Sequence, residues 1–428
     1  MTIAQRKEQI LRIKAASSFS ELNEQLEEEI RREVVKTVQS VLEESLQAEV
    51  SAHLEGLETE RPRRSGSYKR GLSTQFGYIP DLAVPKLRFG NPEREWQVLS
   101  RYARCLTGFL DYASYLYVMG LSLRDLQEAL YLLMGKVLSR SVVNQVTLRV
   151  EERMRQHRQA PISRTPPILI IDGVWVKIQY SRDEFKLDRA GHQRQCRQAE
   201  DRVILAAIAV WPDGTYQLLH YQVSESEDIA AWTAFFEELI ERQLDPKAVE
   251  LVVSDGSQGV PEALSRCFPQ ARQQRCTTHK VRGMERYLTY AHMSDTDEKG
   301  HTLTDSEAKN LRRFQIQSDA YAIYDAPSRK EALLNLSAFV DKWQALEPKA
   351  VHTFQYGSQR TFEFYRFSPA LHPLIRTTNL LERFFREFRT KSDEIGAFPN
   401  ENSCLTLFFL VLQREHAKHN RLPVANTS

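Results

Sequence analysis

Residues 167–173 read Pro167-Ile168-Leu169-Ile170-Ile171-Asp172-Gly173, so that four branched apolar side chains end at a carboxylate. A run of this kind is typical of a strand that is buried on both faces of a sheet. A second strand ends in the same way, at Val252-Val253-Ser254-Asp255-Gly256. Burying an ionised carboxylate at the end of an apolar strand costs free energy unless a cation or hydrogen bonds stabilise it. The two segments therefore predict that Asp172 and Asp255 reach one edge of one sheet.

The residues between these two acids predict an α/β core. The charged stretch Ser181–Arg202 is expected to form a long hairpin loop after the first strand. Strands at 203–211 and 216–223, joined by Pro212-Asp213-Gly214, form a hairpin, and a helix at 226–242 follows. Three antiparallel strands, a helix and a parallel strand are the layout of a ribonuclease-H-like fold, which does not by itself fix the chemistry.

After Arg282 the strand signals vanish for roughly ninety residues and helical patterns replace them. The chain then reaches an amphipathic helix whose apolar face carries Leu381, Phe384, Phe385 and Phe388. A second face of that helix carries Asn379, Glu382, Arg386 and Arg389. One acid among amides and guanidinium groups suggests a metal ligand beside phosphate-binding residues. The alternative is a plain ion pair between Glu382 and Arg386, four residues apart.

The N-terminal part of the chain offers three further features. A helix from Ser20 to about Leu54 has an apolar stripe that can pack on a domain or mediate dimerisation. Residues 60–71 form a basic, Gly- and Ser-rich arm whose candidate DNA contacts are Arg61, Arg63, Arg64, Lys69 and Arg70. Two helices, at 123–134 and 142–155, resemble a helix-turn-helix and would present Asn144, Gln145 and Arg149 to DNA. A solvated loop and an ordinary helical hairpin are the plainer interpretations of the last two features.

Composition places the chain among globular proteins. It has 428 residues, of which 42% are apolar and 27% are charged, and a net charge of +2. Five scattered cysteines fit a reducing compartment better than a disulfide scaffold. Neither a signal peptide nor a membrane-spanning run is evident. We therefore expect a cytoplasmic protein without membrane contact.

Taken together, the motifs resemble the Mutator-type DDE transposases of bacterial insertion sequences over nearly the whole length. The resemblance lies in the order of several segments, namely Glu60-Arg61 through Lys69-Arg70, Val84-Pro85-Lys86, Gly120-Leu121-Ser122, Ile171-Asp172-Gly173, Ser254-Asp255-Gly256, Cys276-Thr277-Thr278-His279 and Thr377-Thr378-Asn379 through Glu382-Arg383. The chain departs from the family pattern at Arg282-Gly283, after the Cys-x-x-His motif, and in the long stretch 181–202.

The resemblance implies a ribonuclease-H-like core split by an all-helical insertion, with a mainly helical N-terminal DNA-binding region. The corresponding segments are 1–58 (helical, dimerisation), 59–98 (basic arm and small β segment), 99–160 (helix-turn-helix-like), 161–283 (core, first part), 284–370 (insertion) and 371–428 (core, C-terminal helices). The resemblance also implies a homodimer that acts on double-stranded DNA. The DNA sites would be the terminal inverted repeats of the element and a target, and the protein would be associated with the bacterial nucleoid.

The implied catalytic residues are Asp172, Asp255 and Glu382, which would bind two Mg²⁺ ions, with Mn²⁺ as a substitute. Three carboxylates without His or Cys suit Mg²⁺, and two such ions can drive in-line displacement at phosphorus. Asp172 precedes Asp255 by 83 residues and Asp255 precedes Glu382 by 127, a gap that the helical insertion explains. Active-site support is assigned to Cys276, His279 and Asn379, and phosphate contacts to Arg376, Arg383, Arg386, Arg389 and Lys391.

Three alternatives stay open from sequence. Cys276 and His279 could be half of a zinc site, although no second pair of ligands stands nearby. Each Asp-Gly pair could be a simple turn. The chain could also be a non-catalytic DNA-binding protein derived from a transposase, whereas a two-carboxylate sugar hydrolase would need neither a metal nor a basic helix.

Overall fold

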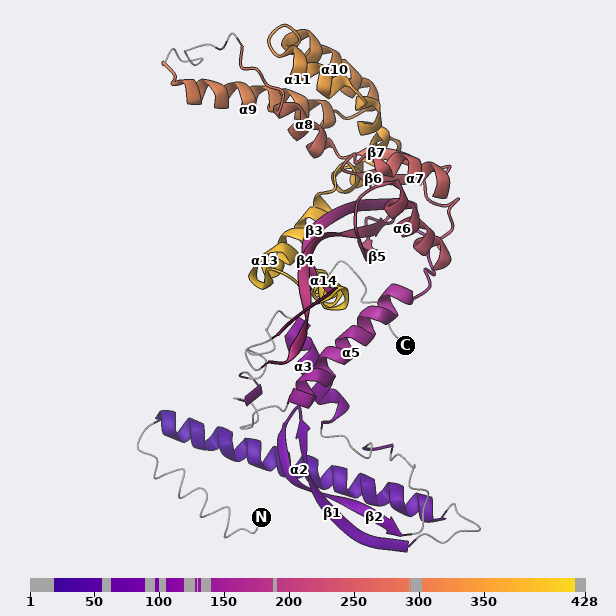
Figure 1. Ribbon diagram of the computed structural model, residues 1–428, viewed down its shortest axis with the longest axis vertical. Coiled ribbons are helices and arrows are strands. Elements are labelled where there is room, and N and C mark those ends of the chain that lie inside the picture. The colour runs from indigo at the N-terminus through magenta and orange to yellow at the C-terminus, as the bar shows by residue number, and fades with distance from the viewer. Residues whose placement is uncertain are drawn as a thin grey trace. The chain divides into compact units, whose positions relative to one another are not determined.

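The computed structural model describes residues 19–55, 63–88, 97–99, 105–118, 128, 130–131, 140–187, 191–291, 293 and 302–419. The chain divides into two compact units, Met1–Glu152 and Arg153–Ser428, and each is described by itself (Figure 1). No helix among the described residues is both long enough and apolar enough to cross a membrane.

Unit 1 is built from the long helix α2 (Phe19–Glu55) and a hairpin of β1 (Arg63–Thr74) and β2 (Gly77–Arg88). Leu46 of α2 is buried with Leu72, Ile79 and Leu82 of the hairpin, which form a small core. The expectation of a basic loop at residues 60–71 is wrong from Arg63 onward, because these residues pair with β2 as a strand. Backbone pairing across the hairpin overrides the local Gly and Ser content there.

Two further helices belong to the N-terminal half, α3 (Thr107–Val118) and α5 (Arg140–Gln159). The helix α5 contains the predicted second helix of the helix-turn-helix, at 142–155. Most of the predicted first helix, 123–134, lies outside the described residues. The helix-turn-helix therefore stays a prediction.

Unit 2 contains a five-stranded mixed sheet with the strand order β5-β4-β3-β6-β7. The long strands β3 (Ile168–Leu187) and β4 (Gln193–Val210) are antiparallel, β5 (Tyr216–Ser224) is antiparallel to β4, and β6 (Leu251–Ser254) is parallel to β3. The last strand, β7 (Arg272–Arg275), is parallel to β6. All four apolar residues of 168–171 are fully buried, as predicted. The expected hairpin loop at 181–202 is wrong, because both strands continue through most of it.

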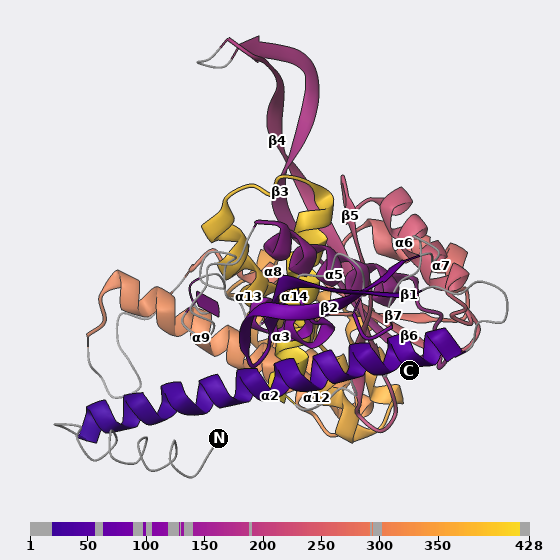
Figure 2. The same cartoon turned by 90° about the horizontal axis from the view of Figure 1, so that it is seen from below.

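Helices cover both faces of the sheet (Figures 1 and 2). On one face α6 (Ile229–Glu241) and α7 (Gly259–Cys267) bury an aromatic cluster around Phe235 and Phe236 against β3 and β4. On the other face lie α13 (Asn379–Ile395) and α14 (Glu401–His419). The apolar side of α13 is buried as predicted, with Phe388 packed edge-on against Phe408 of α14.

Between β7 and α13 the described residues form helices. These are α8 (Thr277–Glu285), α9 (Asp305–Tyr324), α10 (Arg329–Trp343), α11 (Pro348–Gln355), η1 (Ser358–Thr361), η2 (Glu363–Arg366), η3 (Pro369–Leu371) and α12 (His372–Ile375). Trp343 of α10 is buried in this helical segment, with 2% of its surface exposed. The fully buried Gln274 ties this segment to the sheet, because its side chain donates to the Thr361 carbonyl (3.0 Å) and accepts from Phe364 N–H (3.0 Å).

Candidate active site

Asp172 lies on β3 just past the point where β6 stops pairing with that strand. The Gly173 N–H donates to its carboxylate (2.9 Å). Burial raises the pKa of Asp172 to about 7, and the charges of Asp255 and Glu382 add to this effect, while Gly173 and His279 lower the pKa. The two other predicted acids therefore act on Asp172 with the same sign as burial.

Asp255 follows the last residue of β6, and its carboxylate accepts a hydrogen bond from Ser257 N–H (2.8 Å). Gly256 has a φ of +103°, a backbone conformation that L side chains rarely adopt. A Cβ at Gly256 would also lie 2.5 Å from Nε of Arg275. Glycine is therefore required here, because the chain must turn sharply while a guanidinium packs on it.

Glu382 reaches the site through contacts between two distant motifs. The Cys276 N–H donates to the Ser254 carbonyl (2.7 Å), which fixes Cys276 beside the end of β6. The Cys276 thiol in turn accepts from Thr378 N–H (3.4 Å), at the start of α13. Glu382 lies one turn further along α13, and Thr378 Oγ1 donates to its carboxylate (3.2 Å). Hydrogen bonds around Cys276 therefore bring the third acid to the sheet edge.

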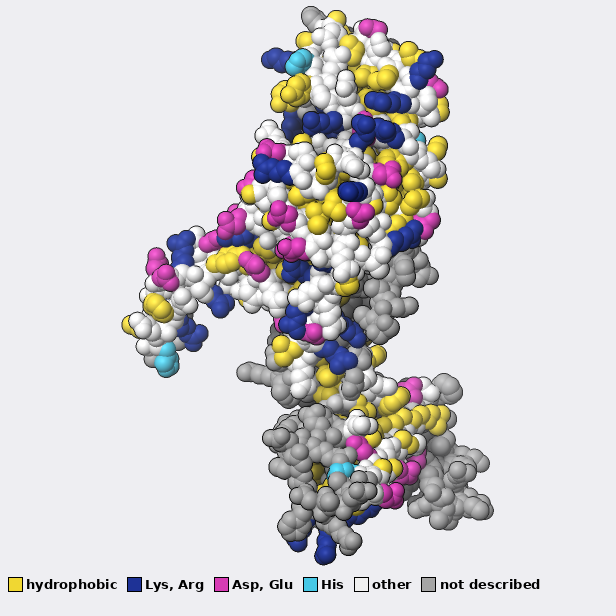
Figure 3. Space-filling model, turned by 90° about the vertical axis from the view of Figure 1, so that its right-hand side faces the viewer, with side chains coloured by type: hydrophobic (Ala, Val, Ile, Leu, Met, Phe, Trp, Pro, Cys, Tyr) yellow, Lys and Arg dark blue, Asp and Glu magenta, His cyan; other side chains and the backbone are white. Residues whose placement is uncertain are grey.

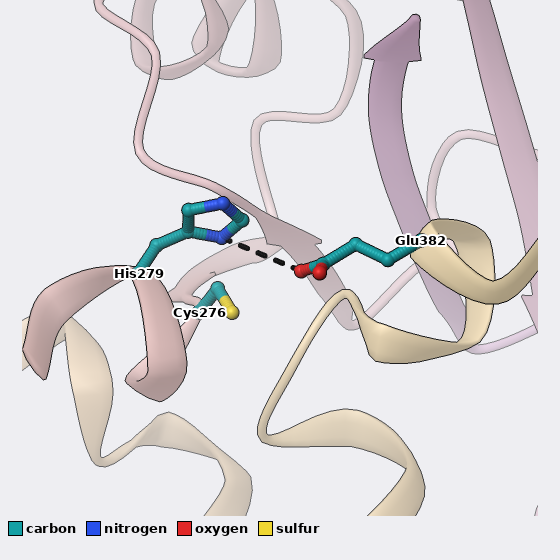
Figure 4. A group of neighbouring side chains, drawn as sticks. All are labelled: Cys276, His279 and Glu382. Atoms are coloured by element: carbon teal, nitrogen blue, oxygen red, sulfur yellow. Dashed lines mark ion pairs between the residues drawn. The ribbon is translucent and has the colours of Figure 1, made fainter. Parts of the chain in front are cut away.

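Figure 4 shows His279 and Cys276 facing Glu382 from the first turn of α8. His279 Nδ1 lies 3.8 Å from the Glu382 carboxylate, and Arg282 lies 3.7 Å from its other oxygen. The hydrogen bond with Cys276 raises the pKa of His279 to about 9, against the effect of burial. Burial opposes ionisation of the thiol, yet bonds from His279 and Thr378 hold the pKa of Cys276 below its usual value. Cys276 and His279 therefore form a hydrogen-bonded pair beside the acid.

A fourth carboxylate, Glu227, was missed by sequence reasoning. A Cβ on Gly173 would lie 2.7 Å from Glu227 Oε1, so Glu227 packs against the backbone of β3 beside Asp172. Burial raises the pKa of Glu227, and the charge of Asp255 adds to this, while a hydrogen bond from Trp175 lowers it. Glycine inside a strand often marks such a close approach, and this signal could have found Glu227.

The three acids fit a divalent cation. Each donates carboxylate oxygens, the ligand type that Mg²⁺ prefers, and their mutual repulsion is the kind that a bound cation relieves. Among the described residues, the group whose possible ligand atoms all lie within 4.8 Å of one another is Cys276, His279 and Glu382. This second set suits a metal less well, because a protonated imidazole has no free lone pair and the thiol already accepts from Thr378.

Comparison with known proteins places the chain in a family. The family model described as transposase, Mutator family, matches residues 1–421. The chain belongs to the Mutator family of transposases. Its relatives include the transposase for insertion sequence element ISRM5 of Rhizobium meliloti, 28% identical over 88% of this chain and 85% of that protein. The transposase for IS256 in transposon Tn4001 of Staphylococcus aureus is 26% identical over 91% of each chain.

Among solved structures, the Drosophila P element transposase strand transfer complex matches 74% of this chain and 92% of that chain, with a TM-score of 0.40 and 10% identity. The family membership makes this chain a transposase of the insertion-sequence type, which acts on DNA.

The candidate DNA contacts of this transposase in α13 fall into two groups. Arg376, just before the helix, donates to the Tyr324 carbonyl (3.0 Å) and to Asp325 (2.6 Å), while Arg383 donates to the Tyr216 hydroxyl (3.3 Å). These two guanidinium groups are engaged within the protein. Arg386 and Arg389 are exposed, and Lys391 pairs with Glu394 at 3.3 Å. Asn379, which was assigned to active-site support, is exposed at the start of α13.

Some of the candidate DNA contacts in unit 1 bond to other residues of the protein, and others are exposed. Arg64 donates to Gln47 (3.0 Å) and Ser51 (2.6 Å) on α2, and Lys69 lies 4.0 Å from Asp81. Of the others, Arg63 and Gln145 are exposed, Arg70 and Arg149 are partly buried, only the backbone of Asn144 is described, and Arg61 lies outside the described residues. The assignment of these residues to DNA contact stays a prediction.

Proposed function

We propose that this transposase cleaves DNA at the terminal inverted repeats of its insertion sequence and joins the 3′-OH ends to DNA. The reaction is DDE-type phosphoryl transfer, with Asp172, Asp255 and Glu382 as the three acids. The observation that carries the proposal is geometric: Asp172 and Asp255 lie on β3 and just after the neighbouring β6, and the Cys276–Thr378 hydrogen bond links the start of the Glu382 helix to the same sheet edge. The raised pKa of Asp172 agrees with this arrangement. Such clustering of perturbed carboxylates is typical of active sites.

The proposed catalytic core is ribonuclease-H-like. It comprises residues 161–283 and 371–428, with residues 284–370 as a helical insertion. The mixed sheet with antiparallel β3, β4 and β5 and parallel β6 supports this proposal, since Asp172 and Asp255 then occupy the first and fourth strands of the layout. Contacts from Gln274 and Cys276 would keep the insertion and α13 in register with the sheet edge.

In the proposed mechanism the carboxylates of Asp172, Asp255 and Glu382 hold two Mg²⁺ ions. When bound, these ions supply activation of the attacking oxygen and stabilisation of the leaving oxygen. His279 and Arg282 add positive charge beside Glu382. Arg386 and Arg389 extend this positive surface along α13, where charge-assisted hydrogen bonds to phosphate oxygens can form.

We also propose a homodimer, since joining two ends requires both to be held together. The support comes from α2, where Leu26, Ile30, Val34 and Val41 are each at least 38% exposed. A groove of about 510 Å³ lies along this stripe between α2 and Phe76 of the hairpin turn. Exposed apolar side chains in a row typically mark an interaction surface, and a second copy of α2 is self-complementary to it.

The test of the proposed reaction is strand cleavage on a duplex that carries the terminal repeat, with Mg²⁺ present. Asp172→Asn, Asp255→Asn and Glu382→Gln should each lower the cleavage rate by about a thousandfold or more, because each removes transition-state stabilisation of several kcal/mol. Glu394→Gln, an exposed acid on the same helix as Glu382, should cleave at the parent rate. Binding without any nicking by the parent protein would instead favour a non-catalytic DNA-binding protein.

A further inference from the structure

The strands β3 and β4 extend far beyond the rest of the sheet. Their pairing continues from Ile178 opposite Glu200 to Leu187 opposite Gln193, whereas β5 pairs with β4 only from Val203 onward. Figure 2 shows this part as a two-stranded ribbon that projects from unit 2, and the space-filling view of Figure 3 shows a narrow protrusion. We call residues 181–187 and 191–198 the ribbon.

The base of the ribbon is fixed to the core. The Gln179 N–H donates to the Phe398 carbonyl (2.8 Å) and the Phe398 N–H donates to the Lys177 carbonyl (2.8 Å). Tyr180 donates to Glu401 (2.5 Å), and the Arg202 guanidinium stacks 4.5 Å from the centre of its ring. These four contacts lie at the base of the ribbon and fix its direction relative to the core of unit 2.

The outer part of the ribbon has no core of its own. Phe185 is 60% exposed and Leu187 is 70% exposed, and an isolated two-stranded hairpin is at best marginally stable in water. Within the ribbon, four described residues are cationic (Arg182, Lys186, Arg194 and Arg197) and two are acidic (Asp183 and Glu184). A net positive charge with exposed apolar side chains suits a polyanionic partner that also offers apolar contacts.

The cross-strand register assigns these side chains to two faces. Gln193, Gln195 and Arg197 alternate along β4 and share one face, and Leu187 and Phe185 lie opposite the two glutamines on that face. On the other face Lys186 and Arg194 stand directly opposite each other.

We propose that the ribbon enters the major groove of duplex DNA, with Gln193, Gln195 and Arg197 against the base edges. Glutamine pairs with adenine and arginine with guanine in that groove, and apolar side chains such as Leu187 contact thymine methyl groups. Lys186 and Arg194 lie near the flanking phosphates, which position the ribbon without reading sequence. This proposal rests on the proposed function, because it takes the transposase's DNA as the partner.

Dimensions support the major groove over the minor groove. Two strands lie about 5 Å apart, and with their side chains they fit a groove about 12 Å wide but not one about 6 Å wide. Gln193, Gln195 and Arg197 stand two residues apart on one face of β4, a spacing that lets a β-ribbon contact successive base pairs.

The experiment compares binding of the parent protein and two ribbon variants to a fluorescein-labelled duplex that carries the terminal repeat and to an unrelated duplex of equal length. Lys186→Ala with Arg194→Ala should lower the slope of log affinity against log salt by about two, one for each lost phosphate contact. Gln193→Ala, Gln195→Ala and Arg197→Ala together should abolish protection of guanine N7 from dimethyl sulfate. Preference for the repeat-bearing duplex should fall by about tenfold or more.

The matched control is Lys247→Ala with Arg272→Ala. These changes remove two exposed cations outside the ribbon, one in the segment before β6 and one at the first residue of β7. The control should keep the parent slope and footprint, and all variants should keep the parent melting temperature. Unchanged slope and guanine protection in both ribbon variants would overturn the proposal, as would protection of adenine N3 in the minor groove. Loss of the dimer with intact DNA binding would overturn it too, since the partner is then a second copy. Failure of the parent to bind any duplex would instead overturn the proposed function.

Discussion

The charge of Asp172 is set by its neighbours rather than by its sequence context. Burial and the carboxylates of Asp255 and Glu382 raise its pKa to about 7, against a value of 3.8 for an unperturbed aspartate. The folded chain therefore binds more protons than the unfolded chain between these two pH values. Stability that depends on this group is present below about pH 4 and is lost as the pH rises through about 7.

This shift leads to a prediction for Asp172→Asn. Without divalent metal, the melting temperature of the parent should fall relative to that of the variant as the pH rises from about 4 to about 7, and the variant should be the more stable protein at pH 8. Removing a buried like charge should raise stability by about 1–3 kcal/mol there. Thermal melts followed by circular dichroism measure the difference. Asp393→Asn, an exposed acid in α13, should track the parent at every pH. Parallel curves for Asp172→Asn and the parent would contradict the proposed repulsion.

His279 titrates in a separate window. Its pKa is raised from 6.5 to about 9 by the hydrogen bond with Cys276 and the charges of Glu382 and Asp172, against the effect of burial. Its contribution to stability is complete below about pH 6.5 and is lost as the pH rises through about 9. His279→Gln should therefore remove the decline in melting temperature between pH 6.5 and 9. His352→Gln, an exposed histidine in α11, should leave the decline unchanged. A decline that persists in His279→Gln would show that another group causes it.

At the scale of elements, the start of α13 determines where Glu382 lies. Thr378 is fully buried and is the last residue before the helix, where its N–H donates to the Cys276 thiol and its hydroxyl donates to Glu382. A single residue thus links the helix to the sheet edge and orients the acid. Orienting contacts of this kind commonly affect metal sites by tenfold to a hundredfold.

Thr378→Val removes the hydroxyl but keeps the N–H and the shape of the side chain. We predict that it lowers the cleavage rate on repeat-bearing DNA by about tenfold or more, with little change in melting temperature, because Glu382 loses its orienting donor. Thr390→Val is the control, since Thr390 lies on the same helix and its hydroxyl donates only to Arg386 O (3.1 Å). Equal cleavage rates for the two variants would argue against an orienting role.

The helix α2 supports a prediction about assembly. Ile30→Glu places a charge in the exposed apolar stripe and should convert the dimer to a monomer in sedimentation velocity, by burying an unpaired charge at the interface. Gln25→Glu adds the same charge at an exposed polar position of the same helix and should remain dimeric. A dimer that survives Ile30→Glu would exclude this face as the contact.

Across the whole molecule, prediction from sequence succeeded where one physical signal dominated. An apolar run placed Asp255 directly after β6, and a helical apolar period placed Glu382 on the face of α13 that lies away from Phe384 and Phe388. Both patterns are local in sequence, and burial enforces them. The expectation that the first strand ends at Asp172 is wrong, because β3 continues to Leu187 and only the pairing with β6 stops before Asp172.

Prediction failed where pairing between strands decided the structure. The ribbon around Gln195 and the strand β1 from Arg63 are polar and resemble loops, yet cross-strand hydrogen bonds hold them extended. Glu227 was missed because its position depends on a tertiary approach to Gly173. The pairing of Cys276 with Thr378 spans 102 residues and has no local signature either.

The central claim is that Asp172, Asp255 and Glu382 form one cation site. Electron paramagnetic resonance of Mn²⁺ titrated into the protein, without DNA, tests it most directly. We predict that the parent and Glu394→Gln bind Mn²⁺ alike, and that Asp172→Asn, Asp255→Asn and Glu382→Gln each weaken binding markedly. Parent-like Mn²⁺ binding by any one of the three acid variants would contradict the claim.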